Sequence, residues 1–245
     1  MKIADTFIYN YIKKIYIQMR ASFNRIVSPS QLTLNSINKY SEKFGFDRGT
    51  PIDRYYIDEF IRNLELNNEF NTALEFGELN YVEQFNVSHK FFLSHPDFSK
   101  SKDTKSQILF DLNTQKKYDG QKFDLIISTN VINFTKNPFV TLRHHIDMLN
   151  IDGTIFLTAS SSMPISQFDA ERWGDYWRFT PDAMHHLLEN LDCEYQVESL
   201  GNFKSSVAFL CGLASEEMEE SDLKEKDNRY PLLVVALIKK KRYSA

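Results

Sequence analysis

The densest group of side chains that could do chemistry lies between residues 169 and 180. Two carboxylates, Asp169 and Asp175, could take a proton from a substrate, since a general base needs only to lie within hydrogen-bond reach. Cationic side chains that could clamp an anion and aromatic rings that could stack on a sugar face complete the group: Arg172, Arg178, Trp173, Tyr176 and Trp177. A structural interpretation fits equally, with packed tryptophans and Arg178 paired with Asp53 or Asp175.

A second group follows a predicted strand that ends at Phe76. Gly77 lies where the backbone must turn tightly and approach a ligand. Glu75 could accept a hydrogen bond from a ligand ammonium group or fix the loop, and Glu78 follows in the same loop. The full G-x-G-x-x-G pattern of dinucleotide-binding loops is absent, and an ordinary strand-to-loop glycine would give the same sequence.

Further polar residues follow two other predicted strands. Asp111 could hold the exocyclic amine of a base while Leu112 packs on the ring, or Asp111 could only fix the following turn. Thr129 and Asn130 follow the apolar run FDLIIS. Ligands of open parallel sheets bind outside the carboxyl ends of the strands, so these residues are expected at one edge with Gly77.

The six histidines favour no metal site. His144 and His145 are adjacent on a predicted helix, as are His185 and His186, and adjacent helical side chains point about 100° apart. His145 could face the site and act as a base, although a surface or packing role is the ordinary expectation. No metal-binding motif is present, so we predict no metal.

Alternating strands and helices after residue 70 predict a mostly parallel, doubly wound sheet with helices on both faces. Seven strands are expected, over residues 72–76, 90–93, 107–110, 123–128, 154–158, 195–200 and 232–239. Helices are expected over 138–149 and from Pro181 to about 191, the second capped by Thr180. A glycine turn is expected over 150–153, and 215–229 reads as a solvated helix or loop.

The first part of the chain is predicted to be helical, over residues 3–27, 30–43 and 51–68. Apolar residues recur at spacing four in the first helix: Ile3, Phe7, Tyr11, Ile15 and Met19. Basic residues outnumber its single acid, Asp5. Such a helix could lie on a membrane surface, pack on the domain, or pack on a second subunit of a homodimer.

Composition limits the function classes. The chain has 245 residues, of which 42% are hydrophobic, enough for one large domain or a domain with a helical extension. A net charge of −4 gives no support for nucleic-acid binding. Cys193 and Cys211 form neither a metal-type pair nor a disulfide framework. With no apolar run of about 18 residues and no signal-peptide pattern, a cytoplasmic location is expected.

Three segments, in this order, carry a resemblance beyond fold: GFDRGTPIDRYYI (45–57), LEFGELNY (74–81) and RWGDYWRFT (172–180). They resemble a bacterial group of class I methyltransferase-like proteins, often encoded with or fused to glycosyltransferases of surface-polysaccharide pathways. FDLIIST, GNFKSSVAFLCGLASEE and YPLLVVALIKK resemble it too, so the resemblance covers roughly residues 42–240.

The resemblance implies a Rossmann-like class I methyltransferase fold, with a methyltransferase-like domain over 51–245 after an N-terminal helical extension over 1–50. It implies S-adenosylmethionine as methyl donor, with donor contacts at Glu75, Gly77, Glu78, Asp111, Leu112, Thr129 and Asn130. Arg54 and Tyr55 could close the substrate site, or belong to an internal salt-bridge network. The sequence departs from the group where it lacks an acid in the second strand and has Glu78 in place of Asp.

Two functional hypotheses follow. The first is an O-methyltransferase that acts on a sugar or glycan of a surface-polysaccharide pathway. The second is a catalytically inert methyltransferase-like scaffold that binds a glycosyltransferase. The missing strand-2 acid favours the second hypothesis, whereas Glu75, Gly77 and Asp111 favour the first. A nicotinamide-dependent enzyme would need a fuller glycine pattern.

Overall fold

The computed structural model describes residues 38–64, 69–98 and 105–241. The helix predicted over 3–27 lies outside the described residues, as does most of the one predicted over 30–43. Residues 38–43 are described and are not helical, so that prediction is wrong there. The Ser41 hydroxyl accepts the backbone N–H groups of Lys43 (2.9 Å) and Gly45 (3.2 Å), which stabilises a turn in place of a helix.

Seven strands form one sheet in the order β3-β2-β1-β4-β5-β7-β6. The strands are β1 (Phe70–Phe76), β2 (Val87–Ser94), β3 (Gln107–Leu109), β4 (Phe123–Thr129), β5 (Leu149–Ser160), β6 (Cys193–Leu200) and β7 (Leu233–Lys240). The pairs from β3 to β5 are parallel, and β7 runs antiparallel between β5 and β6. The predicted seven-stranded, mostly parallel sheet is confirmed.

The turn predicted over 150–153 is wrong, because β5 runs through it. The register against β4 shifts between Phe123 and Leu125. Asp152 has a positive φ of 64° at this place. The glycine-containing segment is therefore an irregularity inside a long strand and not a separate loop.

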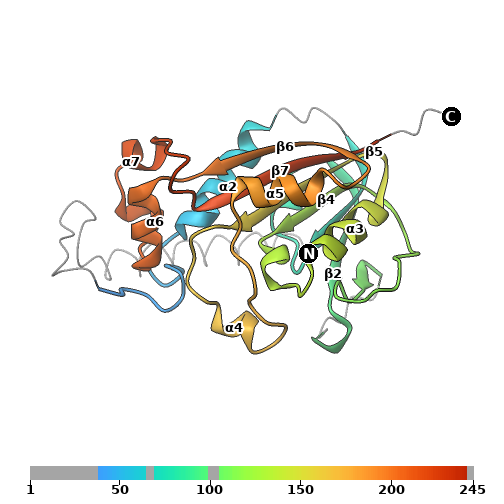
Figure 1. Cartoon of the computed structure of the whole chain (residues 1–245), viewed down its shortest axis with the longest axis horizontal. Helices are drawn as coiled ribbons and strands as arrows, with labels where there is room; N and C mark the ends of the chain where they lie inside the picture. The colour runs from blue at the N-terminus through green and yellow to red at the C-terminus, as the bar shows by residue number, and fades with distance from the viewer. Residues whose placement is uncertain (1–37, 65–68, 99–104, 242–245) are drawn as a thin grey trace, which may run out of the picture. The chain divides into compact units, whose positions relative to one another are not determined.

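Helices cover both faces of the sheet, as predicted. On one face lie α3 (Pro138–Met148) and α5 (Pro181–Leu188), whose side chains share a buried core with the strands (Figure 1). That core includes Leu142, Met148, Met184, Leu188, Ile126, Ile155 and Leu157. On the opposite face, Phe60 of α2 (Ile52–Asn63) stacks on Phe156 of β5 with ring centroids 5.6 Å apart.

The connections on the β1 side contain less helix than the sequence suggested. Between β1 and β2 the chain forms only the 3-10 turn η3 (Val82–Gln84). The described residues between β3 and β4 form no α-helix. The loop after β1 is therefore short and must be fixed by side chains rather than by a following helix.

The chain divides into two compact units. The sheet unit comprises Phe60–Leu200 with the described residues from Leu233, and the N-terminal unit comprises the described residues up to Glu59 with Gly201–Leu232. Two helices of the N-terminal unit lie between β6 and β7 in sequence, α6 (Phe203–Leu210) and α7 (Glu220–Lys224). The predicted boundary at residue 50 remains a prediction. Within its described residues, the chain has no helix long and apolar enough to cross a membrane.

Two of the resembling segments pack on each other inside the N-terminal unit. Arg48 and Glu217 form a bidentate ion pair in which both side chains are buried, with Nε donating to Oε2 at 2.9 Å. Pro51 forms a β-bridge with Ala214. The segments 45–57 and 201–217 thus form one structural assembly.

Candidate active site

Glu75, at the end of β1, is used to fix the loop that follows it. Its carboxylate accepts the backbone N–H groups of Asn80 (2.9 Å), Tyr81 (3.1 Å) and Val82 (3.0 Å), and its exposed fraction is 2%. Of the two roles considered from the sequence, the structure thus supports loop fixation. The carboxylate substitutes for the missing helix by satisfying three backbone donors.

Gly77 follows with a φ of 92°, a conformation that side chains rarely adopt. A Cβ built on it would meet no described atom within 4 Å, so the space beside it is open. Its N–H donates to Leu93 O at 3.0 Å, which ties the loop to the end of β2. Glu78 is exposed in the same loop. The loop therefore leaves room for a ligand against bare backbone at the carboxyl edge of β1.

Asp111 lies after β3 and faces His95, which follows β2. Its Oδ1 accepts the N–H of Asn113 at 2.8 Å, the turn-fixing role, and lies 3.5 Å from Nε2 of His95. His95 Nδ1 accepts the N–H of Asp97 at 3.2 Å, which leaves the ring proton on Nε2, toward Asp111. Leu112 is buried in the hydrophobic core, so the expectation that it packs on a ligand ring is not met.

Asn130 joins the ends of β4 and β5. It adopts the left-handed conformation with φ 59°, directly after Thr129, the half-buried last residue of β4. Its Oδ1 accepts the hydroxyls of Ser160 (3.1 Å) and Thr158 (3.4 Å). Asn130 is 5% exposed, so it stabilises the carboxyl ends of β4 and β5 from inside the fold.

His145 does not fit its predicted role as a base. Its side chain is fully buried, with Nδ1 on Thr141 O (2.7 Å) and Nε2 on the Ser128 hydroxyl (2.9 Å). Its ring stacks on Phe76 with centroids 4.5 Å apart. Burial lowers the pKa of His145 to about 4. A neutral imidazole with both nitrogens occupied joins α3 to the sheet and cannot reach a substrate.

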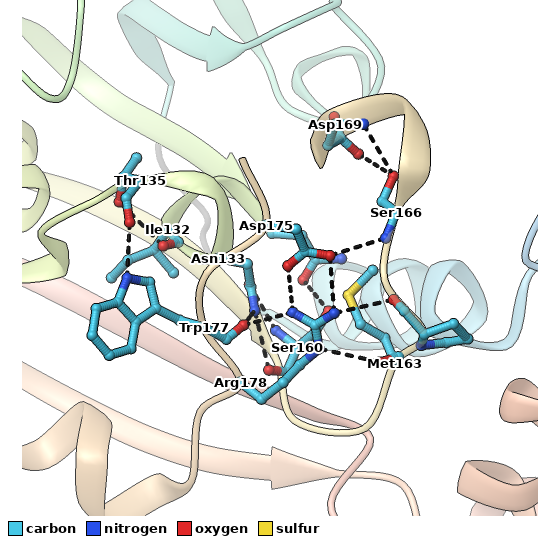
Figure 2. Close-up of polar contacts among 12 residues, drawn as sticks. Ile132, Asn133, Thr135, Ser160, Met163, Ser166, Asp169, Asp175, Trp177 and Arg178 are labelled. Atoms are coloured by element: carbon cyan, nitrogen blue, oxygen red, sulfur yellow. Dashed lines mark hydrogen bonds and ion pairs between the residues drawn. The ribbon is translucent and has the colours of Figure 1, made fainter. Parts of the chain in front are cut away.

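Asn133, which the sequence did not single out, anchors the segment after β5 (Figure 2). It is fully buried, and its Nδ2 donates to Ser160 O (3.2 Å) and Trp177 O (2.6 Å). Its Oδ1 accepts Ser160 N–H at 3.0 Å, and its carbonyl accepts the N–H groups of Tyr176 and Trp177. The only sequence indication was a polar residue between apolar neighbours, Ile132 and Phe134.

Asp175 and Arg178 form a closed structural unit (Figure 2). The Asp175 carboxylate is 1% exposed, pairs with Arg178 at Oδ1 (2.5 Å) and Oδ2 (2.9 Å), and accepts Ser166 N–H at 2.9 Å. Arg178 also donates to the carbonyls of Met163 (3.1 Å), Pro164 (3.1 Å) and Trp177 (2.8 Å). These five bonds match the five N–H donors of a guanidinium group, so Arg178 has no donor left for a substrate anion.

Of the two carboxylates predicted as bases, Asp169 is the one that is partly accessible to a substrate. It is half-buried in α4 (Gln167–Ala170), and its Oδ2 accepts the Ser166 hydroxyl at 2.5 Å (Figure 2). Burial raises the pKa of Asp169 above its ordinary value, and Asp175 nearby acts in the same direction. A raised pKa makes a carboxylate a better proton acceptor.

Exposed aromatic rings lie in the same segment of the chain as Asp169. Tyr176 and Trp177 are 47% and 40% exposed, and Trp177 Nε1 donates to Thr135 O at 2.8 Å. The Tyr176 ring lies over Gly174, whose φ is 93° and whose Cβ would come within 2.4 Å of the ring. The Arg172 guanidinium stacks on Phe168 at 3.4 Å from its centroid, and Trp173 packs edge-on against Phe168. Tyr176 and Trp177 are thus exposed and in contact with their own segment or with Thr135.

Comparison with solved structures identifies the fold. An S-adenosylmethionine dependent methyltransferase from Mesorhizobium loti superposes with a TM-score of 0.51 at 13% identity, over 77% of this chain and 98% of that one. A chain of the complex between the Haloferax volcanii Trm112 methyltransferase activator and a methyltransferase gives 0.50 at 13% identity, over 76% and 89%. The fold is that of class I methyltransferases. No protein-family model and no curated protein match the sequence.

Arg54 and Tyr55, predicted to close the substrate site, belong to the N-terminal unit and not to the sheet unit. Arg54 Nε lies 3.8 Å from Asp53 Oδ2, and the Tyr55 ring packs edge-on against Tyr56. Their role in closing the site remains a prediction. Among the described residues no three His, Cys, Asp or Glu side chains gather as metal ligands.

Proposed function

We propose that the chain is an S-adenosylmethionine-dependent methyltransferase with its donor site at the carboxyl edge of β1 to β3. The observation that carries this proposal is the open space beside Gly77 in a class I methyltransferase fold. Ligands of doubly wound sheets bind outside the strand ends at the switch point, which here lies between β1 and β4. The exposed carboxylate of Glu78 and the edge residue Thr129 flank the strand ends.

The donor would be held by the loop backbone at Gly77 and by Asp111, whose carboxylate is 39% exposed. When bound, S-adenosylmethionine supplies an electrophilic methyl group that a nucleophile can take by in-line displacement. His95 ends the strand-2 stretch in which the resembling group has an acid, and its Nε2 lies 3.5 Å from Asp111 Oδ1.

The acceptor would lie on the segment after β5. The hydroxyl oxygen of the acceptor would form the new bond to the methyl carbon as the carbon–sulfur bond of the donor breaks and S-adenosylhomocysteine leaves, and the hydroxyl proton would pass to the carboxylate of Asp169. Exposed Tyr176 and Trp177, held at fixed positions, suit the apolar face of a pyranose ring. Asp175 and Arg178 hold the segment in shape. We therefore favour O-methylation of a sugar or glycan, of the surface-polysaccharide kind that the resemblance implies, in the cytoplasm.

A specific observation favours the inert scaffold as second candidate. The polar groups of Asp175 and Arg178 are fully engaged inside the fold, and no acid follows β2 before Asp97. An inert domain would be expected to keep the fold of a methyltransferase while the charged side chains of its site serve only to hold that fold. Its exposed rings at 168–177 would then contact a glycosyltransferase.

Transfer to sugar acceptors separates the two candidates. We expect formation of S-adenosylhomocysteine when the protein, the donor and an active nucleotide-sugar or oligosaccharide are combined. Asp169→Asn should lower kcat at least about 100-fold with little change in donor affinity, since a general base contributes about that much. Asp182→Asn, at an exposed carboxylate of α5, is the control. An Asp169→Asn variant as active as the wild type would remove Asp169 as the base.

A further inference from the structure

Helix α6 presents an apolar stripe that the described residues leave uncovered. Phe203 and Leu210 are 57% and 49% exposed, and Val207 between them is half-buried. At spacings of four and three residues, these side chains lie on one side of the helix. Tyr230, 44% exposed, packs edge-on against Phe203 with ring centroids 5.2 Å apart and widens the stripe. Contiguous exposed apolar surface marks an interaction site.

The segment beside this stripe is strongly acidic. Residues 216–227 contain seven carboxylates, of which Glu217 is buried against Arg48 and six remain at least partly exposed, with Lys224 and Lys226 as the only bases of the segment. The segment is held to the start of α6, because Asn202 Nδ2 donates to Asp222 O at 2.7 Å and Lys204 pairs with the Asp222 carboxylate. A partner of this surface is therefore expected to be apolar on one side and basic around it.

The chain itself enters the N-terminal unit at the end of α6. Tyr40 N–H donates to the carbonyl of Cys211 at 2.7 Å, one residue beyond Leu210. Ser41 lies so close to Gly212 that a Cβ there would come within 2.7 Å of its carbonyl oxygen. The described chain thus begins close to the C-terminal end of α6. Twelve residues lie between positions 27 and 40, and the thirteen Cα-to-Cα steps across them reach up to about 43 Å, against about 12 Å for the whole of α6.

We propose that residues 3–27 of the same chain cover the α6 stripe. Their apolar residues recur at helical spacing, and they carry four Lys and Arg against one Asp, the complement of the acidic segment. The tether makes the contact intramolecular, with an effective concentration in the millimolar range for a short flexible linker, so a modest interface suffices. This assignment is independent of the proposed methyl transfer.

Hydrogen exchange on the full-length chain tests the proposal. In the wild type, amides of 3–27 should be protected, and the protection should weaken as NaCl rises from about 0.05 to about 0.5 M. Phe203→Ser combined with Leu210→Lys should lower this protection about tenfold, because the stripe loses its apolar surface and repels the basic segment. Ile151→Lys, at a 64% exposed position of the sheet unit, is the matched control and should leave protection intact.

A second variant tests the contact from the other side. Lys13→Glu combined with Lys14→Glu should lower the protection of 3–27 without changing the exchange of β4 and β5. Absence of protection in the wild type, or equal protection in the stripe variant, would overturn the proposal. Protection lost when a dimer dissociates on dilution would assign the stripe to a second copy instead. Protection seen only with phosphatidylserine vesicles would assign the segment to a membrane, and either result would overturn it.

Discussion

At the scale of single residues, Gly77 combines two demands that only glycine meets. Its φ of 92° is unfavourable for any side chain, by about 1–2 kcal/mol, and the space beside it is where a donor would lie. Gly77→Ala should lower both the free energy of unfolding and the affinity for S-adenosylhomocysteine, measured by denaturation and calorimetry. Gly201→Ala, at a φ of 104° in the N-terminal unit, should lower stability alone. Equal affinities in the two variants would contradict a donor site at Gly77.

Asp169 gives a residue-scale prediction about pH. Burial raises the pKa of Asp169 above its ordinary value of 3.8, so folding favours the protonated carboxyl. Its favourable contribution is complete at low pH and is lost as the pH rises through the raised pKa. Asp169→Asn should therefore gain stability relative to the wild type between about pH 3 and about pH 7, by urea denaturation. A constant difference over that range would show that the carboxyl is solvated in the fold.

The types of residue in the candidate site were predictable from the sequence, but the hydrogen bonds and ion pairs that they form were not. Asp175 and Arg178 were equally compatible with catalysis and with an ion pair, and only coordinates show that all five guanidinium donors are occupied. Leu112 was predicted to pack on a ligand and His145 to act as a base, but both side chains are buried in the fold. Asn133 is three residues past Asn130, and nothing in its spacing distinguishes an anchor from a ligand contact.

At the scale of elements, His145 connects α3 to β1 and β4 through a neutral imidazole. Because burial lowers the pKa of His145 from 6.5 to about 4, the wild type should lose stability as the pH falls from about 6.5 to about 4. The loss should be at most about 3 kcal/mol by the free-energy equivalent of a pKa change. His145→Gln should lack this part of the pH dependence in urea denaturation. An unchanged pH profile would mean that His145 is accessible to protons in the folded state.

Asn133 gives a second element-scale prediction, since it connects η5 (Val131–Phe134), the end of β5 and the 176–177 backbone. Asn133→Ala leaves buried partners unsatisfied and should cost about 2–4 kcal/mol. The two tryptophans of the chain, Trp173 and Trp177, both lie in the anchored segment, so fluorescence reports on it directly. Emission should shift to the red and acrylamide quenching should increase. A stability loss without a fluorescence change would place the effect elsewhere.

Elements with buried apolar runs were predicted well, because β4 and β7 are bounded by turn residues and are buried along most of their length. β2 was predicted too short, since its residues are mostly half-exposed and include Ser88 and His89. The absence of a helix after β1 could not be predicted, because the loop that replaces the helix is fixed by hydrogen bonds from backbone N–H groups to Glu75. Turn formation at Ser41 likewise depended on a side chain that competes with helix hydrogen bonds.

At the scale of the whole molecule, the strand order β3-β2-β1-β4-β5-β7-β6 is the strongest link to function. It brings the ends of β1 and β4 together, since Glu75 pairs with Ile127 in register, and it sets the β5 segment at the same edge. The residues proposed for donor and acceptor binding, although distant in sequence, thus follow the carboxyl ends of neighbouring parallel strands. This proximity is what transfer between two bound molecules requires.

The central claim is that the edge at Gly77 binds S-adenosylmethionine, and calorimetric titration of the full-length chain with S-adenosylmethionine and S-adenosylhomocysteine tests it most directly. We expect one site per chain with a Kd in the micromolar range, about −8 kcal/mol, weakened by Asp111→Ala in a protein that keeps its fold. No heat of binding up to millimolar ligand, from a folded sample, would contradict the account and leave the scaffold as the function that fits this structure.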